Sequence, residues 1–256
     1  MPSFQNLFDV SKKRVLVTGS SRGLGFRIAR GFLERGAIVL LNGRSETQLR
    51  RAATALRHFA NSVQECRFDV TSESEIRRAV REIERNGCID VVVNNVGWQH
   101  RIRLDKVRLS VWQRVLASNL TSAMLVSREV AHGMIRRRAG KIINVCSLMS
   151  DFGRSTTGPY ATAKGGLKML TKAMCADWAR YDIQVNAIGP GYFITNMTQA
   201  LAKNRQFDAW VKRRTPAGRW GEPDELMGAV IFLSSDASSF VNGQIIYIDG
   251  GMSSVL

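Results

Sequence analysis

The chain alternates short runs of apolar residues with longer segments of helical period along most of its length. The apolar runs are residues 14–18 (RVLVT), 37–42 (AIVLLN), 63–70, 89–95 (IDVVVNN), 141–147, 183–190 and 244–249. Most of them are typical of parallel strands buried on both faces, and the helical segments are the crossovers that such strands need. The pattern predicts an α/β fold, a Rossmann-like doubly wound parallel sheet of six or seven strands.

The length of 256 residues is typical of one large α/β domain, and no linker-like tract divides the chain, so we expect a single domain over residues 1–256. Residues 192–221 are polar and lack a strand pattern, which predicts an irregular segment that closes over a binding site as a lid. No apolar stretch is long enough for a membrane span, and the start has no secretory pattern. We therefore expect a cytoplasmic protein with no membrane partner.

The chain is strongly basic, with a formal net charge of +16 from 37 Lys and Arg against 21 Asp and Glu. Its arginines are spread over several helical segments and alternate with acids in residues 76–85 (IRRAVREIER), a pattern typical of solvated helix faces. We therefore expect no nucleic-acid partner, although such a surface attracts small anions. The four cysteines and three histidines are isolated from one another, which predicts reduced thiols and no metal site.

A glycine-rich stretch, TGSSRGLG, directly follows the first predicted strand at residues 18–25. Its glycines let the backbone turn sharply, and the helix after it presents free N–H groups and a positive pole to a pyrophosphate. The spacing GxxxGxG differs from the GxGxxG fingerprint, and a glycine-rich turn without a ligand is the alternative. The position between strand and helix favours a dinucleotide site, whose expected contacts are Gly19, Ser21, Arg22, Gly23, Leu24 and Gly25.

The end of the second strand indicates which dinucleotide binds, because an acid there accepts hydrogen bonds from ribose hydroxyls whereas an arginine accommodates a 2′-phosphate. The sequence reads LNGRSE at residues 41–46, with Gly43 in the place of the acid and Arg44 after it. Arg22 in the glycine-rich stretch can reach the same phosphate. Two cations and no acid predict NADP(H) as the cofactor, with a merely solvated Arg44 as the alternative.

A third pattern combines a hydroxyl, a phenol and an ammonium at Ser147, Tyr160 and Lys164. Pro159 suits the first turn of a helix, so Tyr160 and Lys164 lie one turn apart on one face and can act on one ligand. A nearby ammonium lowers the pKa of a phenol, which suits proton exchange with the oxygen of a ketone or alcohol. The alternative is a buried helix with a core tyrosine and a solvated lysine.

Taken together, these segments resemble the short-chain dehydrogenase/reductase family over about Lys12 to Gly251. The resemblance rests on TGSSRGLG, on NNVG at residues 94–97, on YATAK at residues 160–164, and on Asn119 and Ser147. Val96 departs from the family's usual alanine, and its two additional methyl groups should cost little.

The resemblance implies that Asn119, Ser147, Tyr160 and Lys164 are catalytic. Tyr160 would exchange the proton, Ser147 would hold the substrate oxygen, Lys164 would bind the nicotinamide ribose, and Asn119 would anchor a water chain that resupplies protons. Asp69 would contact the adenine, although an ordinary helix cap is the alternative there. The implied cofactor contacts beyond the glycine-rich stretch and Arg44 are Asp69, Val70, Asn95, Gly97, Tyr160, Lys164, Pro190, Gly191 and Thr195.

Within the family, GYF at residues 191–193 and the segments 207–226 and 232–251 are similar to the gluconate 5-dehydrogenase subgroup. This similarity implies a homotetramer that interconverts a secondary alcohol and a ketone, namely D-gluconate and 5-ketogluconate or a related hydroxy or keto acid. A 3-oxoacyl-carrier-protein reductase and a non-catalytic NADP(H)-sensing protein are the alternatives.

The substrate would contact Ser147, Tyr160 and Arg101. Arg101 lies just after the fourth predicted strand, where doubly wound folds bind ligands, and would pair with the substrate carboxylate. A solvated loop arginine is the alternative for Arg101, and the weaker candidates for the carboxylate are Arg103 and residues 212–214.

Overall fold

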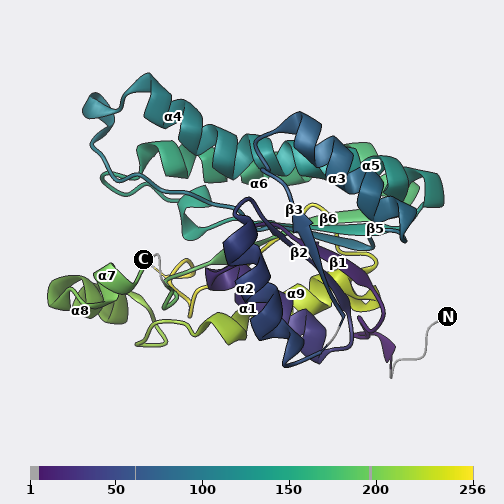
Figure 1. The fold of residues 1–256 in the computed structure, drawn as a ribbon. Helices are drawn as coiled ribbons and strands as arrows, with labels where there is room; N and C mark the ends of the chain where they lie inside the picture. The colour runs from purple at the N-terminus through teal and green to yellow at the C-terminus, as the bar shows by residue number, and fades with distance from the viewer. Residues whose placement is uncertain (1–5, 61, 196–197, 256) are drawn as a thin grey trace.

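The computed structural model describes residues 6–60, 62–195 and 198–255. Its centre is a seven-stranded parallel sheet in the order β3-β2-β1-β4-β5-β6-β7 (Figure 1). The strands are β1 (Arg14–Val17), β2 (Ile38–Gly43), β3 (Val63–Arg67), β4 (Val91–Asn94), β5 (Gly140–Val145), β6 (Ile183–Pro190) and β7 (Ile245–Ile248). The chain order reverses between β1 and β4, which is the point where doubly wound sheets bind ligands. The predicted Rossmann-like single-domain fold is confirmed.

Helices cover both faces of the sheet (Figure 1). One layer contains α1 (Gly23–Glu34), α2 (Glu46–Arg57) and α9 (Met227–Ser234), and the other contains α3 (Glu73–Arg85), α4 (Leu109–Leu116), α5 (Ser122–Arg137) and α6 (Gly158–Trp178). Alternate residues of β1 serve the two cores, because Val15 and Val17 pack with the α1 layer while Leu16 packs with the α3 and α5 layer. The apolar runs are therefore buried on both sides, as a parallel sheet requires.

Local sequence signals fix several helix starts. Ser45 caps α2 by accepting a hydrogen bond from the Gln48 N–H, and Ser72 caps α3 in the same way. Pro159 lies in the first turn of α6, as predicted. The helical chain between β4 and β5 is divided into α4, a π-helical turn at Ala117–Thr121, and α5.

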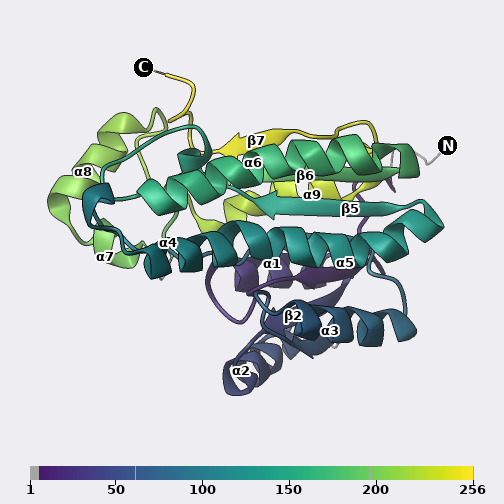
Figure 2. The ribbon, with the colours of Figure 1, turned by 90° about the horizontal axis from the view of Figure 1, so that it is seen from above.

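Residues 192–221 differ from the prediction of an irregular segment, because they contain α7 (Gln199–Ala202) and α8 (Arg205–Arg214). Asn204 caps α8 by accepting from the Phe207 N–H. Val211 and Trp220 are buried together with Leu148 and Met252, so a small apolar cluster packs the segment against the rest of the domain. Figure 2 shows α7 and α8 beyond the edge toward which the β5 and β7 arrows point, the carboxyl edge of the sheet.

No helix in the described ranges is long and apolar enough to cross a membrane. The described residues also contain no group of three or more His, Cys, Asp or Glu side chains placed to hold a metal ion. All four cysteines are unpaired.

Candidate active site

The glycine-rich loop joins β1 to α1 at the carboxyl edge of the sheet. Gly19 has a φ of +61° and Gly23 a φ of +62°, backbone conformations that favour glycine. A Cβ at Gly25 would lie 2.6 Å from the Gly19 carbonyl oxygen, so a side chain cannot be accommodated there. Arg22 precedes α1 without a side-chain cap, and the first turn contains no acidic residue. This helix start can therefore offer its N–H groups to a phosphate.

Asn42, which the sequence analysis did not single out, holds this loop through side-chain hydrogen bonds. Its buried side chain accepts from the Gly19 N–H at 3.1 Å and donates to the Cys66 and Phe68 carbonyls, each at 3.1 Å. One amide thus connects the loop to β2 and to the end of β3. The available signal was a polar residue at the end of an otherwise apolar strand.

Asn95 and Gly97 follow β4 on the other side of the loop. The Asn95 amide donates to the Thr18 and Gly19 carbonyls at 2.9 and 3.2 Å, so this side chain holds the loop in place. A Cβ at Gly97 would lie 3.1 Å from the Asn119 Oδ1 and 3.9 Å from the Lys164 Nζ. A side chain at Gly97 would therefore crowd the Asn119 amide, next to the Lys164 ammonium.

The predicted adenosine end lies across the ends of β2 and β3. The Ser21 Oγ is 3.4 Å from the position of a Cβ at Gly43, and Arg44 pairs with Asp69 at 3.8 Å. Burial alone would raise the pKa of Asp69, but hydrogen bonds from Thr71 and the Arg44 charge outweigh it and hold this pKa below its usual range. Asp69 does not cap α3, because Ser72 does. Val70, the next residue, is buried.

Tyr160 and Lys164 lie one turn apart in α6, with the lysine Nζ 5.7 Å from the centroid of the phenol ring. Lys164 is only 2% exposed and donates to the Val145 carbonyl at 2.7 Å, at the end of β5. Burial lowers the pKa of Lys164 to about 8. The ammonium is thus fixed between the helix and the carboxyl edge.

The expected lowering of the Tyr160 pKa is wrong. Burial raises the pKa of Tyr160 to about 12, the Ser147 hydroxyl opposes this rise, and Lys164 is not among the groups that act on it. The free-energy cost of removing water from the phenolate is larger here than the stabilisation that neighbouring groups give the phenolate. The phenol therefore keeps its proton at neutral pH, which is the form that can donate to a developing alkoxide.

Asn119 lies in the π-helical turn between α4 and α5. Its buried amide donates to the Trp98 carbonyl at 2.7 Å and to the Val115 carbonyl at 2.9 Å, while its Oδ1 accepts from the Trp98 N–H at 3.3 Å. Such π-turns are frequent at functional sites, because they turn a side chain out of helical register.

The ends of β5 and β6 supply further predicted residues. Ser147 follows β5, and its Oγ accepts from the Met149 N–H at 3.2 Å. Pro190 ends β6, and the next residue, Gly191, donates its N–H to the Ile248 carbonyl at 2.9 Å. The Thr195 hydroxyl hydrogen-bonds that of Thr198 at 3.0 Å.

Arg101 lies in the loop after β4, and its exposed side chain is near Arg154 and Tyr192. Among the weaker candidates for the carboxylate, Arg103 and Lys212 have carboxylate partners within the chain. Arg103 pairs with Asp105 at 3.0 Å, and Lys212 pairs with Asp208 at 2.8 Å. These pairings favour Arg101 over Arg103 and Lys212.

Arg154 was missed by the sequence analysis. It donates to the Tyr192 hydroxyl at 2.9 Å, and its guanidinium lies 5.0 Å from the centroid of the Phe207 ring. Only a position seven residues after Ser147 distinguished it from the other 36 Lys and Arg residues of the chain.

Comparisons with known proteins identify the family of the chain. A family model described as enoyl-(acyl carrier protein) reductase matches residues 19–253. A short-chain type dehydrogenase/reductase from Mycobacterium marinum is 32% identical, with a TM-score of 0.92 over 98% of this chain and 99% of that chain. The chain belongs to the short-chain dehydrogenase/reductase family.

Three further members of this dehydrogenase/reductase family carry more specific names. The 5-keto-D-gluconate 5-reductase of Escherichia coli K12 is 46% identical over 96% of this chain and 98% of its own length, and a gluconate 5-dehydrogenase of Gluconobacter oxydans is 43% identical over 98% of both. The crystal structure of a gluconate 5-dehydrogenase from Burkholderia cenocepacia, in complex with NADP and tartrate, is 46% identical, with a TM-score of 0.95 over 98% of this chain and 99% of that chain.

Proposed function

We propose that this dehydrogenase/reductase interconverts a secondary alcohol and a ketone with NADP(H), and that its substrate is a sugar acid, D-gluconate and 5-ketogluconate in particular. The observation that carries the proposal is the arrangement of the Tyr160 phenol beside Ser147 and the buried Lys164, at the edge of the sheet where the glycine-rich loop lies. The names of the gluconate 5-dehydrogenase relatives support the substrate class.

The cofactor phosphates fit the start of α1, where glycines leave the backbone bare and no acid repels an anion. Arg22 and Arg44 would hold the 2′-phosphate, and no carboxylate occupies the place of Gly43. Gly97 leaves space beside Lys164 for the nicotinamide ribose. When bound, NADPH supplies a hydride to the carbonyl carbon of the substrate. The relative bound to NADP supports this choice of cofactor.

Two residues of the chain then act on the substrate oxygen. Ser147 donates a hydrogen bond to it, and Tyr160 delivers a proton as negative charge develops. Because burial raises the pKa of Tyr160 to about 12, the phenol is protonated and ready for reduction at neutral pH. The Lys164 ammonium positions the cofactor ribose, and Asn119 anchors the waters that resupply the proton.

Arg101 binds the substrate carboxylate with a charge-assisted hydrogen bond. Residues 192–221 act as a lid, because α7 and α8 lie beyond the carboxyl edge where the site opens (Figure 2). Closure of such a segment would exclude water from the transferring hydride and proton.

The cytoplasm and a homotetramer are part of the same proposal. Leu109 on α4 and Met169 on α6 are 69% and 61% exposed, and Phe240 before β7 is fully exposed. Large exposed apolar side chains are suited to subunit interfaces. Light scattering of the purified protein gives the subunit number.

A screen of NADPH oxidation tests the proposed function. Its arms are 5-ketogluconate, other keto sugar acids, and acetoacetyl thioesters. Turnover with 5-ketogluconate is the expected result. Preference for the thioester would favour a 3-oxoacyl-carrier-protein reductase, and NADPH binding without any turnover would favour a sensor.

A further inference from the structure

The loop after β4 and the loop after β5 are hydrogen-bonded to each other next to Arg101, the residue predicted to bind the substrate carboxylate. The Ile102 N–H, next to Arg101, donates to the Thr156 carbonyl at 3.0 Å. Thr156 has a φ of +69°, a strained conformation for a β-branched residue and one found mostly where function requires it. This link fixes the loop after β4 against the loop after β5.

Arg154 is anchored at the same junction. Its carbonyl accepts from the hydroxyl of the buried Thr157 at 2.7 Å and from the Thr157 N–H at 3.1 Å. Its side chain reaches Tyr192 and Phe207, which both belong to residues 192–221. Arg154 therefore connects the loop after β5 to the segment proposed as a lid.

Arg101 and Arg154 lie close enough for the charge of one to act on the other. Within the described ranges, neither Arg101 nor Arg154 forms an ion pair with a carboxylate, whereas the nearby Arg103 does. Burial and the Arg154 charge both lower the pKa of Arg101, and only the Tyr192 phenol acts in the opposite direction. Two cations held together without an anion are unfavourable, and a bound carboxylate relieves this repulsion.

We propose that Arg154 acts with Arg101 as a second carboxylate-binding residue, which sets the preference for acidic substrates and transmits the presence of that charge to the lid. This inference rests on the proposed function for the identity of the keto acid. It adds a specificity residue whose partner, Tyr192, lies 38 positions away in the chain. The two guanidinium groups can hold one carboxylate between them, or two acidic groups of one ligand.

The test compares Arg154→Ala, Arg154→Lys and Tyr192→Phe in the full-length enzyme. Arg154→Ala should lower kcat/KM for 5-ketogluconate by about ten- to a hundredfold, mainly through KM, as expected for one lost charge-assisted bond. Arg154→Lys should retain part of the efficiency, and Tyr192→Phe should lose less than Arg154→Ala. NADPH affinity and turnover of an uncharged ketone should stay unchanged. Arg136→Ala removes one exposed arginine at the opposite edge and is the matched control.

A second measurement does not depend on turnover. Calorimetric titration of the NADP-loaded enzyme with tartrate should give a Kd about tenfold or more weaker for Arg154→Ala than for the wild type. Equal Kd values, no tartrate binding by the wild type, or an equal loss on charged and uncharged ketones would each overturn the role of Arg154. If the wild type binds tartrate but does not reduce 5-ketogluconate, the proposed function fails while the comparison of Kd values still decides the inference.

Discussion

The two edges of the sheet each bury a lysine, and the comparison separates chemistry from packing. Lys164 at the carboxyl edge is 2% exposed and Lys141 at the amino edge, in β5, is 7% exposed. Burial lowers the pKa of both side chains to about 8. By burial and pKa alone, the two sites are alike.

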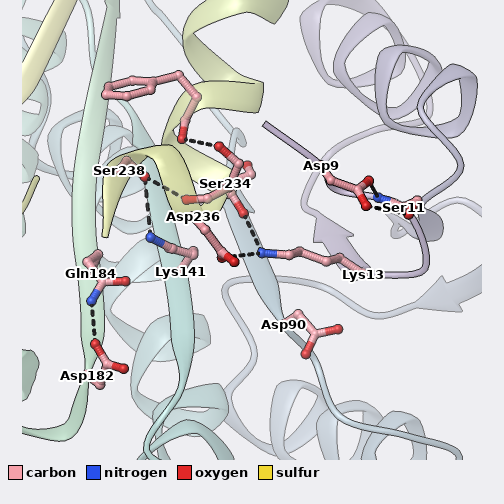
Figure 3. Close-up of polar contacts among 12 residues, drawn as sticks. Asp9, Ser11, Lys13, Asp90, Lys141, Asp182, Gln184, Ser234, Asp236 and Ser238 are labelled. Carbon is pink, nitrogen blue, oxygen red and sulfur yellow. Dashed lines mark hydrogen bonds and ion pairs between the residues drawn. The ribbon is translucent and has the colours of Figure 1, made fainter. Parts of the chain in front are cut away.

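Their surroundings differ. Lys141 donates to the Ser238 hydroxyl at 3.3 Å, and the neighbouring Lys13 contacts Asp236 at 3.3 Å (Figure 3). The charged groups that act on Lys141 are Lys13, Asp236 and Asp182, none of which is a phenol, whereas Lys164 lies beside Tyr160 and near Gly97. A lowered lysine pKa is therefore not sufficient to indicate a catalytic group, and the proton donor and the cofactor loop around it decide the assignment.

Replacing each lysine by methionine should have very different consequences for turnover. Lys164→Met should lower kcat by about a hundredfold or more, because the change removes the ammonium that positions the cofactor ribose. Lys141→Met should leave kcat within about twofold of the wild type, since the amino edge takes no part in the reaction. Steady-state NADPH oxidation by the two folded variants measures both effects. Similar losses for the two variants would remove the distinction drawn between the edges.

The arginines of the carboxyl edge can be distinguished from solvated arginines by cofactor choice. Arg44→Asp should shift the ratio of NADPH to NADH efficiency by about ten- to a hundredfold toward NADH, because a phosphate partner becomes an acid that accepts from ribose hydroxyls. Arg50→Asp on α2 makes the same charge change at an arginine that pairs with Glu46, and it should leave the ratio unchanged. An unaltered ratio in Arg44→Asp would make Arg44 a surface residue.

The amino-edge lysine should act on stability, and this is the smallest expected effect. The folded-state pKa of Lys141 is lowered from 10.5 to about 8, so between these values the unfolded chain binds more protons than the folded one. The free energy of unfolding of the wild type should therefore rise with pH across this window, by about 1 to 2 kcal/mol relative to Lys141→Met.

The charges facing Lys141 are those of Lys13, Asp236 and Asp182. Urea unfolding of wild type and Lys141→Met at pH values on both sides of the window gives the difference. Lys106→Met, at an exposed lysine, is the control. A wild-type advantage that does not change with pH would show that the ammonium is not desolvated.

The features predicted correctly from sequence are those that depend on local periodicity. The strand runs, the glycine-rich loop and the spacing of Tyr160 and Lys164 each lie within one or two adjacent elements, so the order of residues was sufficient. These signals also led to the correct family.

The features missed depend on contacts distant in sequence. The helix α8 is stabilised by the packing of Val211 and Trp220 on Leu148 and Met252, which no polar pattern in residues 192–221 reveals. The direction of the Tyr160 pKa follows from desolvation by several elements at once, whereas the prediction considered one neighbour.

The central claim is that Tyr160 is the proton donor of an NADP(H)-dependent ketone reductase. Tyr160→Phe removes only the hydroxyl, and Tyr181→Phe makes the same change just before β6, at the amino edge. NADPH oxidation with 5-ketogluconate should proceed in the wild type and Tyr181→Phe and fall by about a hundredfold or more in Tyr160→Phe, with NADPH affinity unchanged. Retention of more than about a tenth of wild-type turnover by Tyr160→Phe would contradict the account.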